Sequence, residues 1–519
     1  MMRKEIVSLS LASLLLLLPS CAFAGLFDSN GYPSKGKAIE KFRPAADYSD
    51  VLKGRPLALG IMRTRGQGFV PSRELHDYVH GVMTRLLAGM QLPPSFQPDI
   101  RVLATPEFGG ECTPDGTMIV TVGLLEQLET EDELAFVMGH ELSHAILRHA
   151  QPDWAKKAQY FAVVNGAAVD AVTNAAQTLG GDQASANVAR GLDIARHLAK
   201  LSANVLMPQM SKGQEDEADA LGFDLMVKAG YDPEAPLAVM DKLAEQEAEA
   251  AAAVQAARDA AAKDKGASGG GLMDKLTSGL TVVGQLATGQ KPDSDKIADL
   301  AIFAFDSAVD SMADNAMTHH PAKVREDLLS NYLFTAYRDQ PPVSPTPLPW
   351  AQDSKSPLKA QLTALLAHYT DAENAAAYIA DTSQGTAGMA QAQIARAVAP
   401  PTTNHAYTAY VAAEYYDGRN DDKAAEAAML KAIAGPEPSW EVYSTMVSFY
   451  ISRHNFPRAQ QLMDQAVIRF EDSPVLLPKR IQLLRLENRD ADAQMLVPKC
   501  KSYDIDELTD ACKKEAGKS

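Results

Sequence analysis

Cysteine is scarce in this chain, with four among 519 residues, and none of them has the spacing of a metal site. Positive charge is also in deficit, because 49 Lys and Arg residues stand against 66 Asp and Glu residues, a net charge of -17. This balance repels nucleic acid, so nucleic-acid binding is set aside. Beyond the N-terminus, no run reaches the roughly eighteen continuous apolar residues of a transmembrane helix. The length and the 46% of hydrophobic residues therefore predict a globular chain of more than one domain.

The N-terminus has the pattern of an export signal. A short basic start precedes an apolar run over residues 6–18, which is too short to span a bilayer, and Ala22-Phe23-Ala24 resembles a cleavage site. We therefore expect a signal peptide over residues 1–24 and a periplasmic mature chain. The alternative is lipid attachment at Cys21, which would make the chain an outer-membrane lipoprotein.

Export would permit disulfides. Cys500 and Cys512 lie close together near the C-terminus and could close a short loop that holds the last helix in place. The alternative is two free thiols. Cys112 has no evident mate.

Composition divides the mature chain into three regions. Residues 25–337 have a mixed composition, and the Ala/Glu-rich and Gly/Ser-rich stretch over about 243–316 reads as an insertion in that domain. Residues 338–357 are rich in proline, which predicts a stiff extended linker. Residues 358–519 are rich in alanine and tyrosine and predict a helical domain.

The last region carries a repeat of one large and two small residues at a shift of 34. Its members are Tyr416, Ala425 and Ala432, then Tyr450, Ala459 and Ala466. This period is typical of tetratricopeptide (TPR) repeats, whose stacked helix pairs form a concave binding surface. The alternative is a helical bundle with chance spacing.

A motif with metal-binding spacing lies in residues 130–150. Thr130 and Glu133 form a capping box, which predicts that a helix begins there. On a helix, His140 and His144 project from one face one turn apart, which suits two imidazole ligands of Zn²⁺. Glu141 lies beside the metal, where its carboxylate can take a proton from a metal-activated water.

The third ligand is expected from a second helix. Catalytic zinc needs three protein ligands, and Glu215 and Asp219 are four residues apart in an acidic segment. Glu215 can complete the triad while Asp219 accepts a hydrogen bond from a ligand histidine. The alternative is that these acids form a solvated helix face.

Other histidines with suggestive spacing are assigned structural roles. His76 and His80 have the same spacing but no downstream acidic helix, so we expect them on the surface of an ordinary helix. His149 is five residues past His144, which on a continuing helix directs it away from the metal.

The segments HELSH and EDEAD, with the later Gly230-Tyr231-Asp232-Pro233, resemble the HtpX/BepA-type zinc metallopeptidases, the family of the CAAX prenyl proteases. The resemblance covers roughly residues 70–330. With the export signal and the repeats, it is nearest to BepA-like periplasmic proteases that also act as chaperones. It implies one Zn²⁺ on His140, His144 and Glu215, in a mostly α zincin-like domain with a small β-sheet, followed by a TPR-like domain.

The resemblance also implies roles for residues outside the triad. His320 would reach the open zinc position as a latch, and Arg325 follows it as a stabiliser of the transition state. The spacing from His320 to Arg325 is one residue short of the pattern, and His319 restores it. Residues 117–122 are β-branched and predict a strand. Its Met118, Ile119 and Val120 would bind an extended substrate along a sheet edge.

With these patterns, the resemblance implies an exported zinc endopeptidase acting on unfolded or misassembled envelope proteins. The repeats would contact the outer-membrane assembly machinery, and peripheral membrane contact fits the same picture. The alternatives are a TPR-containing chaperone or scaffold with an idle or latched zinc site, and a zinc hydrolase with a non-peptide substrate.

Overall fold

The computed structural model describes residues 32–33, 35–52, 68–149, 210–248, 320–352, 355–380, 386–435, 438, 440–470, 473–503 and 506–517. The predicted signal peptide, Cys21, His319 and nearly all of the predicted insertion lie outside these residues. Within them, the chain is mostly helical, and no helix is both long and apolar enough to cross a membrane.

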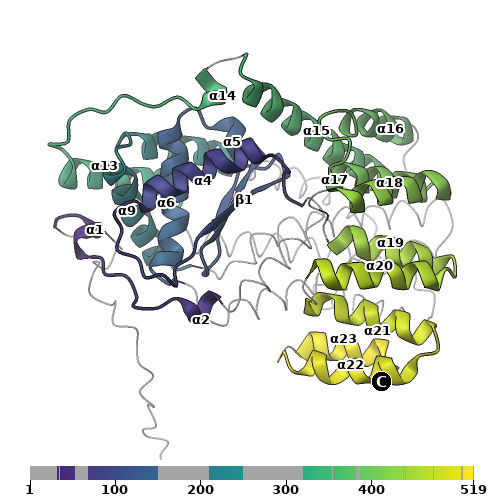
Figure 1. Ribbon diagram of the computed structural model, residues 1–519. Helices are drawn as coiled ribbons and strands as arrows, with labels where there is room; N and C mark the ends of the chain where they lie inside the picture. Colours follow the sequence, from purple (N-terminus) through teal and green to yellow (C-terminus); the bar gives the residue numbers. More distant parts are fainter. Residues whose placement is uncertain are drawn as a thin grey trace, which may run out of the picture.

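A three-stranded sheet forms one layer of the first domain, in the order β1-β3-β2. Strand β1 (Asp99–Leu103) pairs parallel to β3 (Thr117–Thr121), and β2 (Gly110–Cys112) pairs antiparallel to it. Helices α4 (Arg73–Leu87) and α6 (Glu131–Ile146) pack against this sheet, and the short α5 (Val122–Gln127) follows β3 (Figure 1).

The predicted substrate strand is the central strand of the sheet, so its assignment as an edge is wrong. Met118 and Val120 face the main hydrophobic core, while Ile119 packs in a second cluster on the other face. Because both of its faces are apolar and both of its edges are paired, β3 cannot accept a substrate strand. The edge beside α6 belongs to β2 instead.

Further helices pack beside α6, and residues 235–248 are helical as well. Helix α9 (Lys212–Lys228) packs along α6, and α13 (Ala322–Ala336) packs on α9 (Figure 1). Asp224 of α9 joins these helices to the N-terminal segment, which includes α1 (Ala38–Lys41) and α2 (Ser49–Leu52). Its carboxylate accepts hydrogen bonds from the Ile39 N–H at 2.8 Å and from the hydroxyls of Tyr332 and Tyr337.

The end of the proline-rich segment is packed, whereas residues 341–347 are largely exposed and without helix, as predicted for an extended linker. Leu348 and Trp350 are fully buried, and the indole N–H of Trp350 donates to the carbonyl of Leu125 at 2.7 Å. Residues 349–352 form the short helix α14. We call residues 346–352 the strap. The apolar side chains of Leu348 and Trp350 hold the strap against the first domain. The spacing of the prolines gives no sign of this burial.

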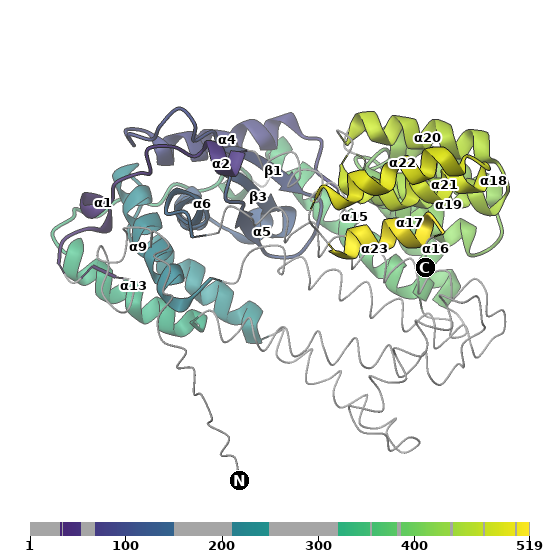
Figure 2. The same ribbon diagram turned by 90° about the horizontal axis from the view of Figure 1, so that it is seen from below.

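The remaining helices form pairs stacked beside the first domain, with α15 against α5 (Figure 2). They are α15 (Pro357–Ala380), α16 (Thr386–Ala397), α17 (Ala406–Asp417), α18 (Asp422–Ala434), α19 (Trp440–Ser452), α20 (Phe456–Arg469), the 3₁₀ turn η2 (Pro474–Leu476), α21 (Leu477–Leu486), α22 (Asp490–Lys501) and α23 (Asp506–Glu515).

The turns inside three successive pairs share one geometry at a 34-residue period. Asn420, His454 and Asn488 each have a left-handed backbone, with φ of 59°, 56° and 59°. The residue after each donates its N–H to a carbonyl five residues back in the preceding helix. The repeat is therefore structural, while its membership of the TPR class stays a prediction. At the end of the array, a disulfide joins Cys500 of α22 to Cys512 of α23. Cys112 is buried and belongs to no disulfide of the described residues.

Candidate metal centre

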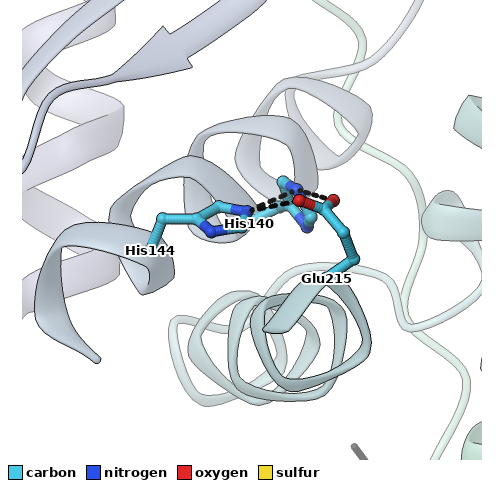
Figure 3. A group of neighbouring side chains, drawn as sticks. All are labelled: His140, His144 and Glu215. Carbon is cyan, nitrogen blue, oxygen red and sulfur yellow. Dashed lines mark hydrogen bonds and ion pairs between the residues drawn. The ribbon is translucent and has the colours of Figure 1, made fainter. Parts of the chain in front are cut away.

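Helix α6 begins where the sequence predicts. The Thr130 hydroxyl accepts a hydrogen bond from the Glu133 N–H at 3.1 Å, and the Glu133 carboxylate accepts from the Thr130 N–H at 3.4 Å. This capping box fixes the helix start and hence the direction of the side chains one turn apart. His140 and His144 both point toward α9 (Figure 3).

Glu215 comes from the first turn of α9, which Ser211 caps by accepting from the Gln214 N–H at 3.3 Å. Its two carboxylate oxygens lie 3.5 Å from the Nε2 atoms of His140 and His144, and those nitrogens are 3.1 Å apart (Figure 3). All three side chains are buried.

The donor atoms fit a zinc ion. Ligand bonds of about 2.0–2.1 Å in a tetrahedron place neighbouring donor atoms about 3.3 Å apart. The observed separations of 3.1–3.5 Å agree with that value. Two imidazoles and one carboxylate leave a fourth position for substrate or water, as in a catalytic site. Among the described residues, this is the group of three that could hold a metal ion.

His140 is oriented by a buried carboxylate and an arginine. Its Nδ1 is 2.8 Å from Asp219, whose two oxygens accept from Arg325 at 2.6 and 2.9 Å. Burial raises the pKa of Asp219, but Arg325 and His140 outweigh it and lower this pKa to about 2. The ionised carboxylate fixes the His140 ring with Nε2 toward the metal position. Arg325 thus acts on Asp219 in this structure.

Replacing Arg325 by lysine is expected to destabilise this arrangement. The charge remains, but the two-point bond to Asp219 is lost, which should lower the free energy of unfolding by about 1–2 kcal/mol. Urea unfolding of the metal-free protein measures this loss. Arg396→Lys is the matched control, because Arg396 makes a similar two-point bond to Asp371 at the surface. Equal losses of unfolding free energy in the two variants would contradict the expectation that the buried bond to Asp219 stabilises more than the exposed one to Asp371.

Glu141 follows His140 on α6 and is not one of the three residues of the cluster. Burial, with the nearby charges of Glu215 and Glu111, raises the pKa of Glu141 to about 7. A carboxyl group with that pKa can both accept and return a proton near neutral pH. Strand β2 passes close by, since a Cβ added to Gly110 would lie 3.8 Å from Cγ of Glu141.

His320 precedes α13 and lies outside the cluster. Its Nε2 is 3.6 Å from Asp216, a buried neighbour of Glu215. Burial and the positive charges of Lys212 and Arg325 lower the pKa of His320. His320 and Asp216 thus form a pair of their own, and the latch stays a prediction.

The remaining histidines differ in outcome. His76 and His80 stack on each other on α4, with ring centroids 5.9 Å apart, and belong to no metal cluster of the described residues. His149 is outside the metal cluster, but its Nδ1 lies 3.0 Å from Nδ1 of His144, a contact that continuing the helix does not predict. The physical reason is that α6 ends at Ile146 and the chain turns back at Arg148, whose φ is 58°.

Sequence reasoning also missed the glycines that let α6 and α9 meet. A Cβ on Gly222 would lie 2.5 Å from the backbone nitrogen of His140, and one on Gly139 would lie 2.9 Å from the carbonyl of Gly222. A glycine inside each helix, one directly before HELSH and one shortly after EDEAD, was the available signal, because interior helix glycines often have a packing reason.

Comparison with known proteins agrees with this site. The model of peptidase family M48 matches residues 73–325. Mitochondrial metalloendopeptidase OMA1 of Arabidopsis thaliana is 29% identical over 145 residues, 28% of this chain and 25% of that protein. OMA1 of Schizosaccharomyces pombe is 28% identical over 188 residues, 35% of this chain and 48% of its own length. Metalloprotease YcaL of Escherichia coli is 26% identical over 144 residues, 28% of this chain and 50% of that protein.

The chain thus spans between a quarter and a half of the length of these curated relatives. The matched segment contains all three residues of the cluster, together with Glu141 and Arg325. The similarity to peptidase family M48 therefore covers the segment that holds the candidate metal centre.

Proposed function

We propose that this chain is an exported zinc endopeptidase that hydrolyses unfolded or misassembled envelope proteins, in the manner of HtpX/BepA-type enzymes. The observation that carries the proposal is Glu141, a carboxylate held beside a three-ligand cluster and next to a strand edge. A purely structural metal site has no need of such a base. Relatives named as metalloendopeptidases support the same reaction.

The chemistry divides between metal and protein. A zinc ion held by His140, His144 and Glu215 would supply Lewis acidity toward water and toward the scissile carbonyl. Glu141 takes the proton from the attacking water and passes it to the leaving amine. Asp219 holds the His140 ring in place throughout.

Substrate is proposed to bind along β2. The Thr121 N–H donates to the Gly109 carbonyl, and the Thr113 N–H to the Thr117 carbonyl. Ladder bonds alternate in an antiparallel pair, so the main-chain groups of Gly110 point away from β3. They are therefore available to pair with an extended peptide beside Glu141.

Gly110→Ala is expected to lower kcat/KM for an unfolded substrate about 3- to 10-fold, because the edge must shift. The new Cβ would lie 3.2 Å from Val137 of α6, a contact tighter than ordinary packing. The neighbouring Gly109→Ala is the matched control, since its Cβ would meet Thr121 at 3.8 Å. Steady-state hydrolysis of casein, with zinc content measured in parallel, separates the two. Equal kcat/KM values for both variants would contradict the proposal that substrate binds along β2.

The wider role rests on sequence expectations. A periplasmic location, with lipid attachment at Cys21 as the alternative, follows from the N-terminal pattern. The helix pairs would bring substrates, or the outer-membrane assembly machinery, to the cleft. The competing function is a chaperone or scaffold with an idle or latched site.

One experiment separates these functions. The purified chain is stripped with a chelator, reloaded with one equivalent of zinc, and incubated with casein and with an unfolded outer-membrane β-barrel protein. The peptidase predicts fragments from the zinc-loaded form alone. Zinc binding with suppressed aggregation and no fragments would favour the chaperone, and absence of zinc binding would contradict the metal site itself.

A further inference from the structure

The turn after α6 brings a third histidine back to the metal site. The His149 N–H donates to the carbonyl of His144 at 3.1 Å, after the left-handed residue Arg148. From α9, the side-chain amide of Gln214 donates to the His149 carbonyl at 3.0 Å. Backbone bonds to both metal-bearing helices therefore fix His149, and its side chain is only 4% exposed.

The ring of His149 lies between a metal ligand and a carboxylate. Its Nδ1 is 3.0 Å from Nδ1 of His144, and its Nε2 is 3.2 Å from a carboxylate oxygen of Glu217. The two rings are nearly perpendicular, with centroids 5.0 Å apart. Each nitrogen of His149 thus has one partner.

The ligand geometry sets the direction of these bonds. Nε2 of His144 faces His140 and Glu215, so it is the nitrogen that offers its lone pair to a metal. A neutral imidazole that binds through Nε2 carries its proton on Nδ1. His144 therefore donates to Nδ1 of His149, which leaves the His149 proton on Nε2, facing Glu217.

We propose that His149 is a positioning residue of the metal site, which holds the ring and tautomer of His144 and connects it to Glu217. It does for His144 what Asp219 does for His140, where the carboxylate makes a direct contact at 2.8 Å. Each ligand histidine is then connected to a carboxylate of α9. His140 contacts Asp219 directly, and His144 is connected to Glu217 through the imidazole of His149. Such partners raise the basicity of the ligand and fix its direction.

This inference rests on the metal site of the proposed function and not on peptide hydrolysis, so zinc affinity tests it without a substrate. The variant His149→Phe keeps an aromatic ring of similar volume and removes both nitrogens. It is expected to raise the Kd for zinc about 10- to 100-fold, measured by competition with a chromophoric chelator. His149→Asn can place an oxygen acceptor near the Nδ1 position and should stay within about threefold of the parent.

Two further measurements exclude a merely structural role. Thermal unfolding of the metal-free forms should give midpoints for His149→Phe and His149→Asn within a few degrees of each other. In the zinc-loaded protein, the Nδ1–H proton resonance of His144 should exchange slowly with solvent in the parent and in His149→Asn, and rapidly in His149→Phe.

Glu217→Gln is a second variant that should leave the fold intact, because this side chain is 29% exposed. It leaves an acceptor for the His149 N–H but removes the charge, so a roughly threefold to tenfold weaker zinc affinity is expected. Parent-like affinity in both His149→Phe and Glu217→Gln would overturn the proposal. Should His149→Phe fail to fold, Glu217→Gln alone decides. A parent that binds no zinc would instead contradict the proposed function.

Discussion

Replacing Glu141 by glutamine is expected to reduce kcat/KM for peptide hydrolysis by about 10²- to 10⁴-fold and to leave the zinc content unchanged. Glutamine matches the volume of the side chain and can still accept a hydrogen bond, but it cannot take a proton from water. The three ligand atoms come from other residues. Metal binding and proton transfer are therefore separable in this site.

The test pairs steady-state hydrolysis of unfolded casein with elemental analysis of zinc. Glu141→Asp is the matched variant, because it keeps the carboxylate and moves it back by one methylene, and it should retain more activity than Glu141→Gln. Full activity of Glu141→Gln would exclude proton transfer by Glu141. A joint loss of zinc and activity would assign this residue to metal binding instead.

Gly222→Ala is expected to lower the free energy of unfolding by about 1–3 kcal/mol, because the new methyl overpacks the contact between α6 and α9. Its Cβ would lie 2.5 Å from the His140 nitrogen and 2.8 Å from the His140 Cα. These are backbone atoms, so the helices themselves must separate. Since Glu215 and His140 sit on opposite sides of this contact, zinc affinity should fall by roughly 10- to 100-fold, as when an outer-shell partner is lost.

Gly81→Ala is the control for this prediction. Gly81 lies inside α4, where an added Cβ would meet nothing within 4 Å, so alanine should stabilise the helix by about 0.5–1 kcal/mol. Urea unfolding of the metal-free proteins and zinc competition measure both effects. If Gly222→Ala were as stable and as tight for zinc as Gly81→Ala, the close approach would have no role in forming the site.

The candidate site was predictable where local chemistry determines geometry. Thr130 and Glu133 fix the start of α6, so the helical spacing of His140 and His144 carries through to the structure. On α9, Ser211 caps the helix start in the same way and so fixes the direction of Glu215. The spacing of four residues between Glu215 and Asp219 also anticipates that one faces the metal and the other a ligand histidine.

The rest depends on features that a local pattern does not contain. A run of β-branched residues predicts that 117–121 is a strand, but not which strands flank it, so the edge was misassigned to β3. The position of His149 follows from a left-handed backbone at Arg148, which few residue types other than glycine favour. Extrapolating the helix past Ile146 therefore did not reveal the contact between His149 and His144.

The strap moves the structural boundary between the first domain and the helix pairs. Thr346 donates its N–H to Asp132 at 2.6 Å and accepts from the Glu131 N–H at 2.8 Å, at the start of the helix that carries both metal-binding histidines. A shuffling event that exchanged the repeat array at Tyr337, where the composition changes, would leave these groups and the Trp350 site bare. A chimera that keeps the strap with the first domain must therefore be joined after Gln352. By its contacts the strap belongs to the first domain, although it lies beyond the change of composition at Tyr337.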